Sequence, residues 1–109
     1  MKRGELWWEL LEQRAESQQA GHRPVVVSSS NWWNDAKPLM VAVVPISLSL
    51  GATPNQIDVP AGMGGLTNEA ALLPEHLRFV DCRRLTAPIG GELSSEIMDR
   101  LRDALLRAL

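Results

Sequence analysis

The longest unbroken apolar segment of this chain, Leu39 to Ile46, constrains the fold more than any other part of the sequence. Its eight residues are rich in β-branched side chains, and that length is typical of a strand rather than of a helix. Because apolar and polar side chains do not alternate in it, we expect a strand that is buried on both faces. A membrane-spanning helix needs about 20 apolar residues, so no transmembrane segment is expected.

Further short segments have the composition of strands and are separated by turn-forming residues. With the segment above, the expected strands cover residues 5–11, 24–28, 39–46, 55–59 and 72–80. A short helix is the alternative for residues 5–11, and residues 72–80 are one strand or a pair because Pro74 interrupts them. Residues 12–22, 29–38 and 50–54 are expected to form loops, and residues 60–65 a glycine-rich turn. Pro24 is expected only at the very start of its strand, because proline lacks a backbone N–H.

A helix is predicted near the carboxyl end of the sequence, after a connection at residues 88–91. Ser94 or Ser95 can cap its first turn, where the helix dipole also favours Glu96. Its apolar residues recur at steps of three and four and form a stripe of Ile97, Leu101, Leu105 and Ala108. Several short strands followed by one helix predict a mainly β fold, a small antiparallel barrel capped by that helix.

The composition predicts one globular domain over residues 1–109. Hydrophobic residues make up 45% of the chain and charged residues 22%, which argues against disorder. Globular domains usually contain about 100–200 residues, so the chain has room for one. Charged residues at the amino terminus and again at Glu9 leave no apolar region for a signal peptide. A cytoplasmic location is therefore expected.

Few catalytic templates fit the sequence. Cys82 is the only cysteine, which excludes an internal disulfide and a cysteine-based zinc cluster, and His22 and His76 stand far apart in the sequence. We therefore expect no metal site. The glycines at 62, 64 and 65 lack the lysine and serine of a phosphate-binding loop. The net charge of −2 gives no general excess of basic residues for binding nucleic acid, although nine of the eleven basic residues are arginines.

The junction between the first predicted loop and the second predicted strand carries the pair Arg23-Pro24. Strand alternation places Arg23 on the same face as Val25 and Val27. Its guanidinium then either points into a cleft or lies at the rim of the core with a buried stem, and a surface ion pair is the third alternative. Arginine binds phosphate through two parallel hydrogen bonds, which makes this position a candidate phosphate contact.

Taken together, these motifs resemble the MazF/PemK (Kid) family of toxin endoribonucleases from bacterial toxin–antitoxin pairs. The matching segments follow one another along the whole chain: Lys2 to Trp7, Gln19 to Ser28, Trp33-Asn34, Val44 to Ser47, Leu77 to Asp81, Arg84-Leu85 and Ile89-Gly90. The resemblance implies a small SH3-like β-barrel with a carboxyl-terminal helix that works as a homodimer. It also implies metal-free, sequence-specific cleavage of single-stranded RNA without a cofactor, and a MazE-like antitoxin whose acidic tail occupies the RNA groove.

The resemblance assigns two catalytic roles directly. In this family the ribose 2′-OH attacks its own phosphate, so the protein must remove a proton, stabilise the charge of the phosphorane and protonate the leaving 5′-oxygen. The motif arginine, Arg23, is expected to stabilise that charge. Ser47 stands where the family has a threonine and keeps the hydroxyl that can donate to a phosphate oxygen.

The general base is left open among several residues. Gln18 stands at the family's acidic position in the first loop, and an amide cannot act as a general base. Glu16 and His22 in the same loop, and Glu75 just before the matching segment Leu77 to Asp81, are the candidates to replace it. His76 is a further alternative.

Four residues are expected to contact RNA: Gln18, Trp32, Trp33 and Arg78. Aromatic faces stack unpaired bases at about 1–3 kcal/mol each, so one of the two tryptophans is expected to line the RNA groove. The alternative is that one tryptophan closes the barrel core or the dimer interface.

Two other functions are compatible with the same barrel. A CcdB-like protein that poisons DNA gyrase is expected to lack the Arg-Pro motif and to end in Trp-Gly-Ile, whereas this chain has Arg23-Pro24 and ends in Arg107-Ala108-Leu109. A catalytically weakened relative that only binds RNA or a partner is the other alternative, because Gln18 replaces an acid.

Overall fold

A computed structural model of the chain describes residues 1–11, 21–49, 51 and 53–109. In this part of the chain the strands are β1 (Glu5–Leu10), β2 (His22–Val27), β3 (Met40–Ser47), β4 (Ile57–Val59), β5 (Ala70–Leu72), β6 (Arg78–Asp81) and β7 (Leu85–Glu92). The α-helices are α1 (Asn31–Asp35) and α2 (Ser95–Ala108), and the short 3-10 helices are η1 (Met63–Gly65), η2 (Pro74–His76) and η3 (Cys82–Arg84). Neither α-helix is long and apolar enough to cross a membrane.

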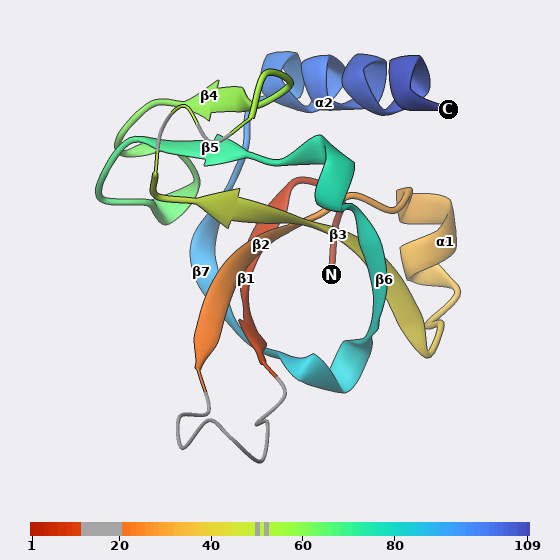
Figure 1. The fold of residues 1–109 in the computed structure, drawn as a ribbon. Helices are drawn as coiled ribbons and strands as arrows, with labels where there is room; N and C mark the ends of the chain where they lie inside the picture. Colours follow the sequence, from red (N-terminus) through yellow and green to blue (C-terminus); the bar gives the residue numbers. More distant parts are fainter. Residues whose placement is uncertain (12–20, 50, 52) are drawn as a thin grey trace, which may run out of the picture.

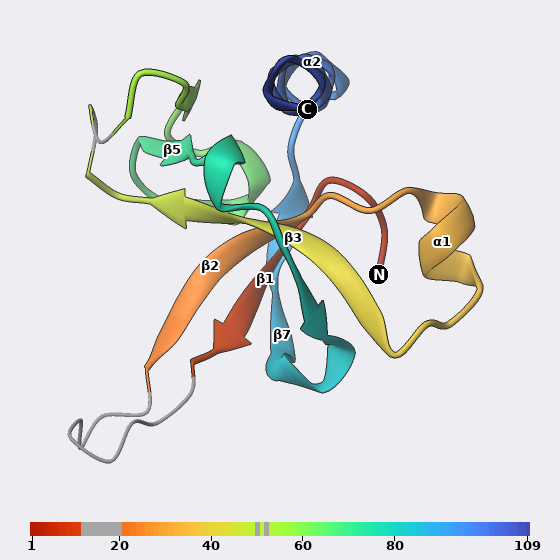
Figure 2. The same cartoon turned by 45° about the vertical axis from the view of Figure 1, so that its right-hand side comes forward.

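The described strands form one antiparallel sheet in the order β4-β5-β3-β2-β1-β7, and β6 also pairs with β3. The sheet curls, so that β7, β1, β2, β3 and β6 follow one another around a ring (Figure 1). Helix α2 lies outside this ring, beside β4 and β5 (Figures 1 and 2). The fold is therefore the predicted one, mainly β and barrel-like with a carboxyl-terminal helix.

Strand β3 is the centre of the sheet, as its apolar sequence predicts. Its residues from Val41 to Ile46 are all buried. On one edge β3 pairs with β2, and on the other edge it pairs with β6 near its start and with β5 near its end. A strand paired on both edges and covered on both faces has no place for polar side chains, which explains its lack of alternation.

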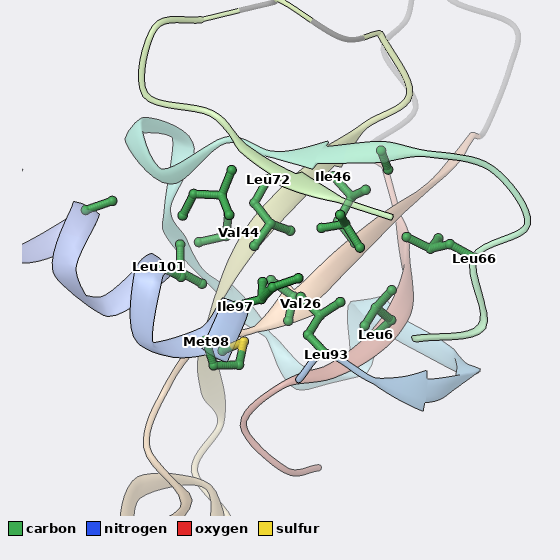
Figure 3. Close-up of a cluster of buried hydrophobic side chains, with 14 residues drawn as sticks. Leu6, Val26, Val44, Ile46, Leu66, Leu72, Leu93, Ile97, Met98 and Leu101 are labelled. Atoms are coloured by element: carbon green, nitrogen blue, oxygen red, sulfur yellow. The ribbon is translucent and has the colours of Figure 1, made fainter. Parts of the chain in front are cut away.

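Two clusters of buried apolar side chains lie on the two faces of the curled sheet. The outer cluster packs between the sheet, α2, β4 and β5 (Figure 3), and it comprises Leu6, Val26, Val44, Ile46, Ile57, Val59, Leu66, Ala70, Leu72, Leu93, Ile97, Met98, Leu101 and Ala104. The inner cluster is smaller and comprises Val25, Val27, Val41, Val43, Val80 and Leu85, with Trp7 and Cys82 packed against it. Successive residues of β2 alternate between the two clusters, as a strand requires.

Helix α2 begins where the sequence predicts it. The Ser94 hydroxyl accepts a hydrogen bond from the backbone N–H of Ile97 at 3.3 Å and caps the first turn. The buried face is made of Ile97, Met98, Leu101 and Ala104, which corrects the predicted stripe. Leu105 is only partly buried and Ala108 is exposed, because the helix continues beyond the outer cluster.

Two predicted connections contain regular structure instead. Residues 29–38 were expected to be a loop, but they hold α1, which Ser30 caps by accepting a hydrogen bond from the backbone N–H of Trp33. The connection expected at residues 88–91 belongs to β7, which pairs with β1. Pro88 is tolerated there because β7 is an edge strand of the described sheet, and its pairing with β1 contains register shifts.

Strand β2 begins at His22, two residues before the predicted start, so Pro24 lies inside the strand. The pairing of β2 with β3 runs only from Val25 to Val27. Pro24 therefore lies where β2 has no β3 partner, and its missing N–H costs no ladder hydrogen bond on that side.

Candidate active site

The candidate site lies where β2 and β3 separate. Their last cross-strand pair is Val25 with Pro45, and beyond it the end of β3 pairs with β5 instead. The start of β2 and the end of β3 diverge from this point (Figure 1). Arg23 and Ser47 each lie two residues past that last pair, on the two diverging ends. The fold therefore gathers the two residues expected to contact the scissile phosphate at one opening of the sheet.

Arg23 is a partly buried cation on the inner face of the sheet, the face of Val25 and Val27. Among the described residues its guanidinium has no hydrogen-bond or ion-pair partner. A guanidinium carries five N–H donors, and a partly buried one without partners is free to bind an anion. Of the alternatives for Arg23, a surface ion pair is not present among the described residues.

Glu9 lies directly across from Arg23 in the β1–β2 ladder. Its side chain is buried, and only 1% of the residue is exposed. The carboxylate accepts a hydrogen bond from Nη2 of Arg78, with which it forms an ion pair. A buried carboxylate needs a compensating partner, so Arg78 is held to Glu9 across the inside of the curled sheet.

Arg78 begins β6 and pairs with Val43 of β3. Its side chain is 36% exposed, so part of the guanidinium faces solvent while Nη2 binds Glu9. The inner face thus carries two arginines and one carboxylate at one place, with a formal charge of +1. Glu9 is a member of this cluster that the sequence did not single out. The available signal was a carboxylate between apolar residues of β1, directly after two tryptophans.

Ser47 ends β3 and is partly buried. Its Oγ donates a hydrogen bond to the backbone carbonyl of Ser49 and accepts one from the backbone N–H of Ser49, both at 3.1 Å. The preceding residue, Ile46, points into the outer cluster, so alternation turns Ser47 to the inner face, the face of Arg23. The hydroxyl is held in place by the turn that follows it.

A hollow of 310 Å³ lies on the other face of the same opening. Trp8, His22, Pro24, Leu48 and Asn68 are among the residues that line it. His22 is exposed and directly precedes Arg23, but alternation places it on the opposite face. Apolar side chains with a few polar groups are the usual lining of a ligand site.

The two other candidate general bases that the structure describes, Glu75 and His76, do not contact this cluster. Glu75 lies in η2, is exposed, and accepts a hydrogen bond from the Thr53 hydroxyl at 3.2 Å. His76 follows it and is also exposed. Glu16 and Gln18 lie outside the described residues.

The two tryptophans of α1 lie at the other end of β3 from Ser47. The Trp33 indole Nε1 donates a hydrogen bond to the carbonyl of Met40, the first residue of β3, at 2.9 Å, and its ring meets Phe79 edge-on with centroids 6.3 Å apart. At about 3.3 Å per residue, Met40 and Ser47 are separated by roughly 23 Å. Trp32 is 82% exposed. Neither tryptophan belongs to a buried cluster, so neither closes the core.

No three His, Cys, Asp or Glu side chains among the described residues lie together in a way that could hold a metal ion. The charged groups that the described residues bring to the inner face here are Arg23, Arg78 and Glu9, and Glu9 is already paired with Arg78. Such a set of donors suits an anionic ligand with several acceptor oxygens, such as a phosphodiester.

Comparison with solved structures gives the class of the fold. The chain superposes on a crystal structure of MazE-MazF (Form-II) from Deinococcus radiodurans with a TM-score of 0.83, covering 99% of this chain and 94% of that one at 22% identity. The chain therefore shares its fold with that structure.

Sequence comparison then gives the family. The chain is 30% identical to Endoribonuclease EndoA of Bacillus subtilis over 96% of its own length and 90% of the relative, and 28% identical to Endoribonuclease MazF9 of Mycobacterium tuberculosis over 89% and 86%. Residues 2–109 match the PemK-like, MazF-like toxins of type II toxin-antitoxin systems, and the chain belongs to this family.

Proposed function

We propose that this protein is the toxin of a toxin–antitoxin pair and a metal-independent, sequence-specific endoribonuclease that cleaves single-stranded RNA. The observation that carries the proposal is Arg23, a partly buried guanidinium without a partner among the described residues, at an opening of the sheet. The names of the relatives, two endoribonucleases, support the same activity.

The reaction is an internal transesterification. The ribose 2′-oxygen loses its proton to a general base and bonds to the adjacent phosphorus. The phosphorus–5′-oxygen bond then breaks, and the 5′-oxygen takes up a proton from a general acid. The products are a 2′,3′-cyclic phosphate and a 5′-hydroxyl end. No external nucleophile is required, so the protein supplies proton transfer and stabilisation of charge.

Arg23 and Ser47 would divide the stabilisation of charge. The Arg23 guanidinium donates hydrogen bonds to the non-bridging oxygens of the phosphorane, whose charge exceeds that of the starting diester. The Ser47 hydroxyl exchanges its bond to the Ser49 carbonyl for one to a phosphate oxygen, while the Ser49 N–H continues to hold it. Both contributions grow as the transition state forms.

His22 is the described base candidate nearest to Arg23 in the sequence, and it lines the hollow on the other face of the same opening. Glu16 stays a candidate outside the described residues, and Glu75 is a candidate only if RNA extends to η2. Separate Glu16→Gln and His22→Gln variants distinguish the first two, because a base contributes typically 10²–10⁴-fold to the rate. Activity unaffected by either variant would move the assignment to Glu75 or His76.

The partners follow from the same proposal. RNA would contact Arg78 and Gln18, with Trp32 available to stack a base because its ring is exposed. The protein would act in the cytoplasm as a homodimer. The likeness of this chain to a solved MazE-MazF structure from Deinococcus radiodurans supports a MazE-like antitoxin as the inhibitor. Its acidic tail would compete with RNA for the arginines, so association should slow with added salt.

The direct test is incubation of the purified protein with a defined single-stranded RNA in EDTA, followed by mapping of the ends. We expect cleavage at a fixed sequence with 5′-hydroxyl ends. RNA binding without cleavage would instead support a catalytically weakened relative. Inhibition of DNA gyrase without any action on RNA would support the CcdB-like alternative.

A further inference from the structure

We propose that Glu9 is a positioning residue of this site: it holds Arg78 against the inner face and leaves Arg23 free for the scissile phosphate. The inference rests on the proposed function and adds a residue to it. Glu9 does not touch the reacting atoms in this account, because only 1% of it is exposed. It acts through the arginine that it binds.

The burial of Glu9 is what makes the arrangement rigid. A carboxylate removed from water is strongly destabilised unless a cation and further hydrogen bonds compensate it. Arg78 supplies that compensation from a strand that is 69 residues away in sequence. Breaking the contact would leave an unpaired buried charge, so the Arg78 guanidinium is fixed more firmly than an arginine on the surface.

The pairing also decides which arginine stays available. Glu9 lies opposite Arg23 in the β1–β2 ladder, yet its carboxylate binds Arg78. If Glu9 bound Arg23 instead, the Arg23 guanidinium would have to release a carboxylate before it could bind phosphate. With Arg78 in that role, Arg23 has no competing ligand among the described residues.

Arg78 keeps the capacity for a second contact. One of its terminal nitrogens binds Glu9, and 36% of the side chain remains exposed. A guanidinium has five N–H donors, so the donors not bound to Glu9 can reach a phosphate oxygen of the RNA. The fixed orientation of those donors is the contribution that we assign to Glu9.

A purely structural ion pair is the alternative, and it makes a different prediction. A structural pair would affect the melting temperature and leave turnover of the folded protein unchanged. A positioning role predicts that kcat falls while RNA binding is kept or strengthened, because loss of Glu9 also removes a negative charge beside two arginines. Single-stranded nucleic acid binding depends on salt with a slope of about 0.7 per cationic contact.

The test compares Glu9→Leu with Glu9→Gln. Leucine matches the apolar neighbours and releases Arg78, whereas glutamine keeps an acceptor without the charge. We expect kcat to fall about 10–100-fold in Glu9→Leu, as misplacement of a contacting group does, and less in Glu9→Gln. In both variants KM should be unchanged or lower, and the salt dependence of RNA binding steeper.

A double variant shows whether Glu9 acts through Arg78. Glu9→Leu/Arg78→Leu replaces the whole pair by apolar side chains, which proteins often tolerate without loss of stability. We expect it to be no slower than Glu9→Leu alone, because for turnover a displaced Arg78 and an absent one are equivalent. A double variant that is a further tenfold slower would overturn the proposal.

Asp81→Asn is the matched control. It also removes a carboxylate bound to an arginine, but Asp81 and Arg83 form an exposed pair away from Arg23. We expect kcat and the salt dependence of this variant to equal those of the parent. Folded Glu9→Leu protein with kcat within twofold of the parent would overturn the positioning role.

A spectroscopic readout keeps this test independent of the proposed activity. In ¹⁵N–¹H spectra of the free protein, the Arg78 side-chain N–H signals should be protected from exchange, and Glu9→Leu should abolish that protection. If the parent cleaves no RNA but shows this change, the proposed function fails while the contact stands. Unprotected Arg78 signals in the parent would overturn the inference itself.

Discussion

The outer and inner faces of the curled sheet are built from the same strands but covered in different ways. The outer face is closed by α2, β4 and β5, with fourteen buried apolar residues in the described chain. The inner face has six buried apolar residues and, beside them, the group of Glu9, Arg23 and Arg78. One side is closed by packing, and the other keeps charges at an opening.

We therefore expect the outer face to determine the stability of the fold and the inner face to determine the rate of turnover. Burying apolar side chains stabilises the fold by about 25 cal/mol per Å², and the outer face contains most of that burial. Charges brought to the inner face cost desolvation and are retained together only because Glu9 and Arg78 compensate each other. Substitutions on the outer face should therefore change unfolding, and substitutions on the inner face should change turnover.

The largest effect on stability is expected for Leu101→Ala. Leu101 is 1% exposed in the outer cluster (Figure 3), and truncation of a buried leucine to alanine costs roughly 2–5 kcal/mol. Urea denaturation should show this loss, while cleavage per folded molecule at low temperature should match the parent. Leu106→Ala on the exposed side of the same helix is the control and should change little. A large loss of turnover in folded Leu101→Ala protein would contradict the expectation that outer-face substitutions change unfolding alone.

A smaller effect, on turnover alone, is expected for Ser47→Ala. The variant loses one hydroxyl donor to the phosphate, so single-turnover cleavage should slow about tenfold, equivalent to about 1.4 kcal/mol. The melting temperature should change little, because only the contacts to Ser49 are lost. Ser47→Thr keeps a hydroxyl at this position and should cleave at the rate of the parent. Equal rates for Ser47→Ala and the parent would remove Ser47 from the site.

The smallest effect is expected at Asp81, outside both clusters. Hydrogen bonds from the side chain and backbone of Arg83 lower the pKa of the Asp81 carboxyl from 3.8 to about 2. Since the folded-state pKa is the lower one, the ionised carboxylate stabilises the fold fully above pH 3.8, and this contribution disappears as the pH falls towards 2. The difference in urea midpoint between the parent and Asp81→Asn should therefore shrink over that range. A difference that stays constant with pH would contradict the assignment.

Much of the fold could be predicted because its signals are local. The apolar sequence of β3 and the capped, periodic sequence of α2 each identify their element without reference to the rest of the chain. Helix α1 was missed because five residues are too few to show periodicity, and it depends on the Ser30 cap. Strand β7 was missed because its proline and glycines are typical of turns rather than of strands. It also depends on pairing with β1, which is distant in the sequence.

The residues of the candidate site also differ in whether a local sequence pattern indicates them. Arg23 could be placed on the inner face from alternation alone, and the family motif indicated Ser47. The contact between Glu9 and Arg78 joins residues 69 positions apart, so no local pattern could reveal it. It exists because the curl of the sheet brings β6 across from β1, which only the folded chain shows (Figure 1).

The most direct test of the account is the single-turnover cleavage rate of Arg23→Ala in EDTA, with thermal unfolding measured on the same sample. Arg23 has no partner among the described residues, so its removal should leave the melting temperature unchanged. Loss of a donor aimed at transition-state charge costs about 10²–10³-fold in rate. We predict a loss of roughly that size for Arg23→Ala. Cleavage by folded Arg23→Ala protein within a few-fold of the parent would contradict the central claim that this guanidinium stabilises the transition state.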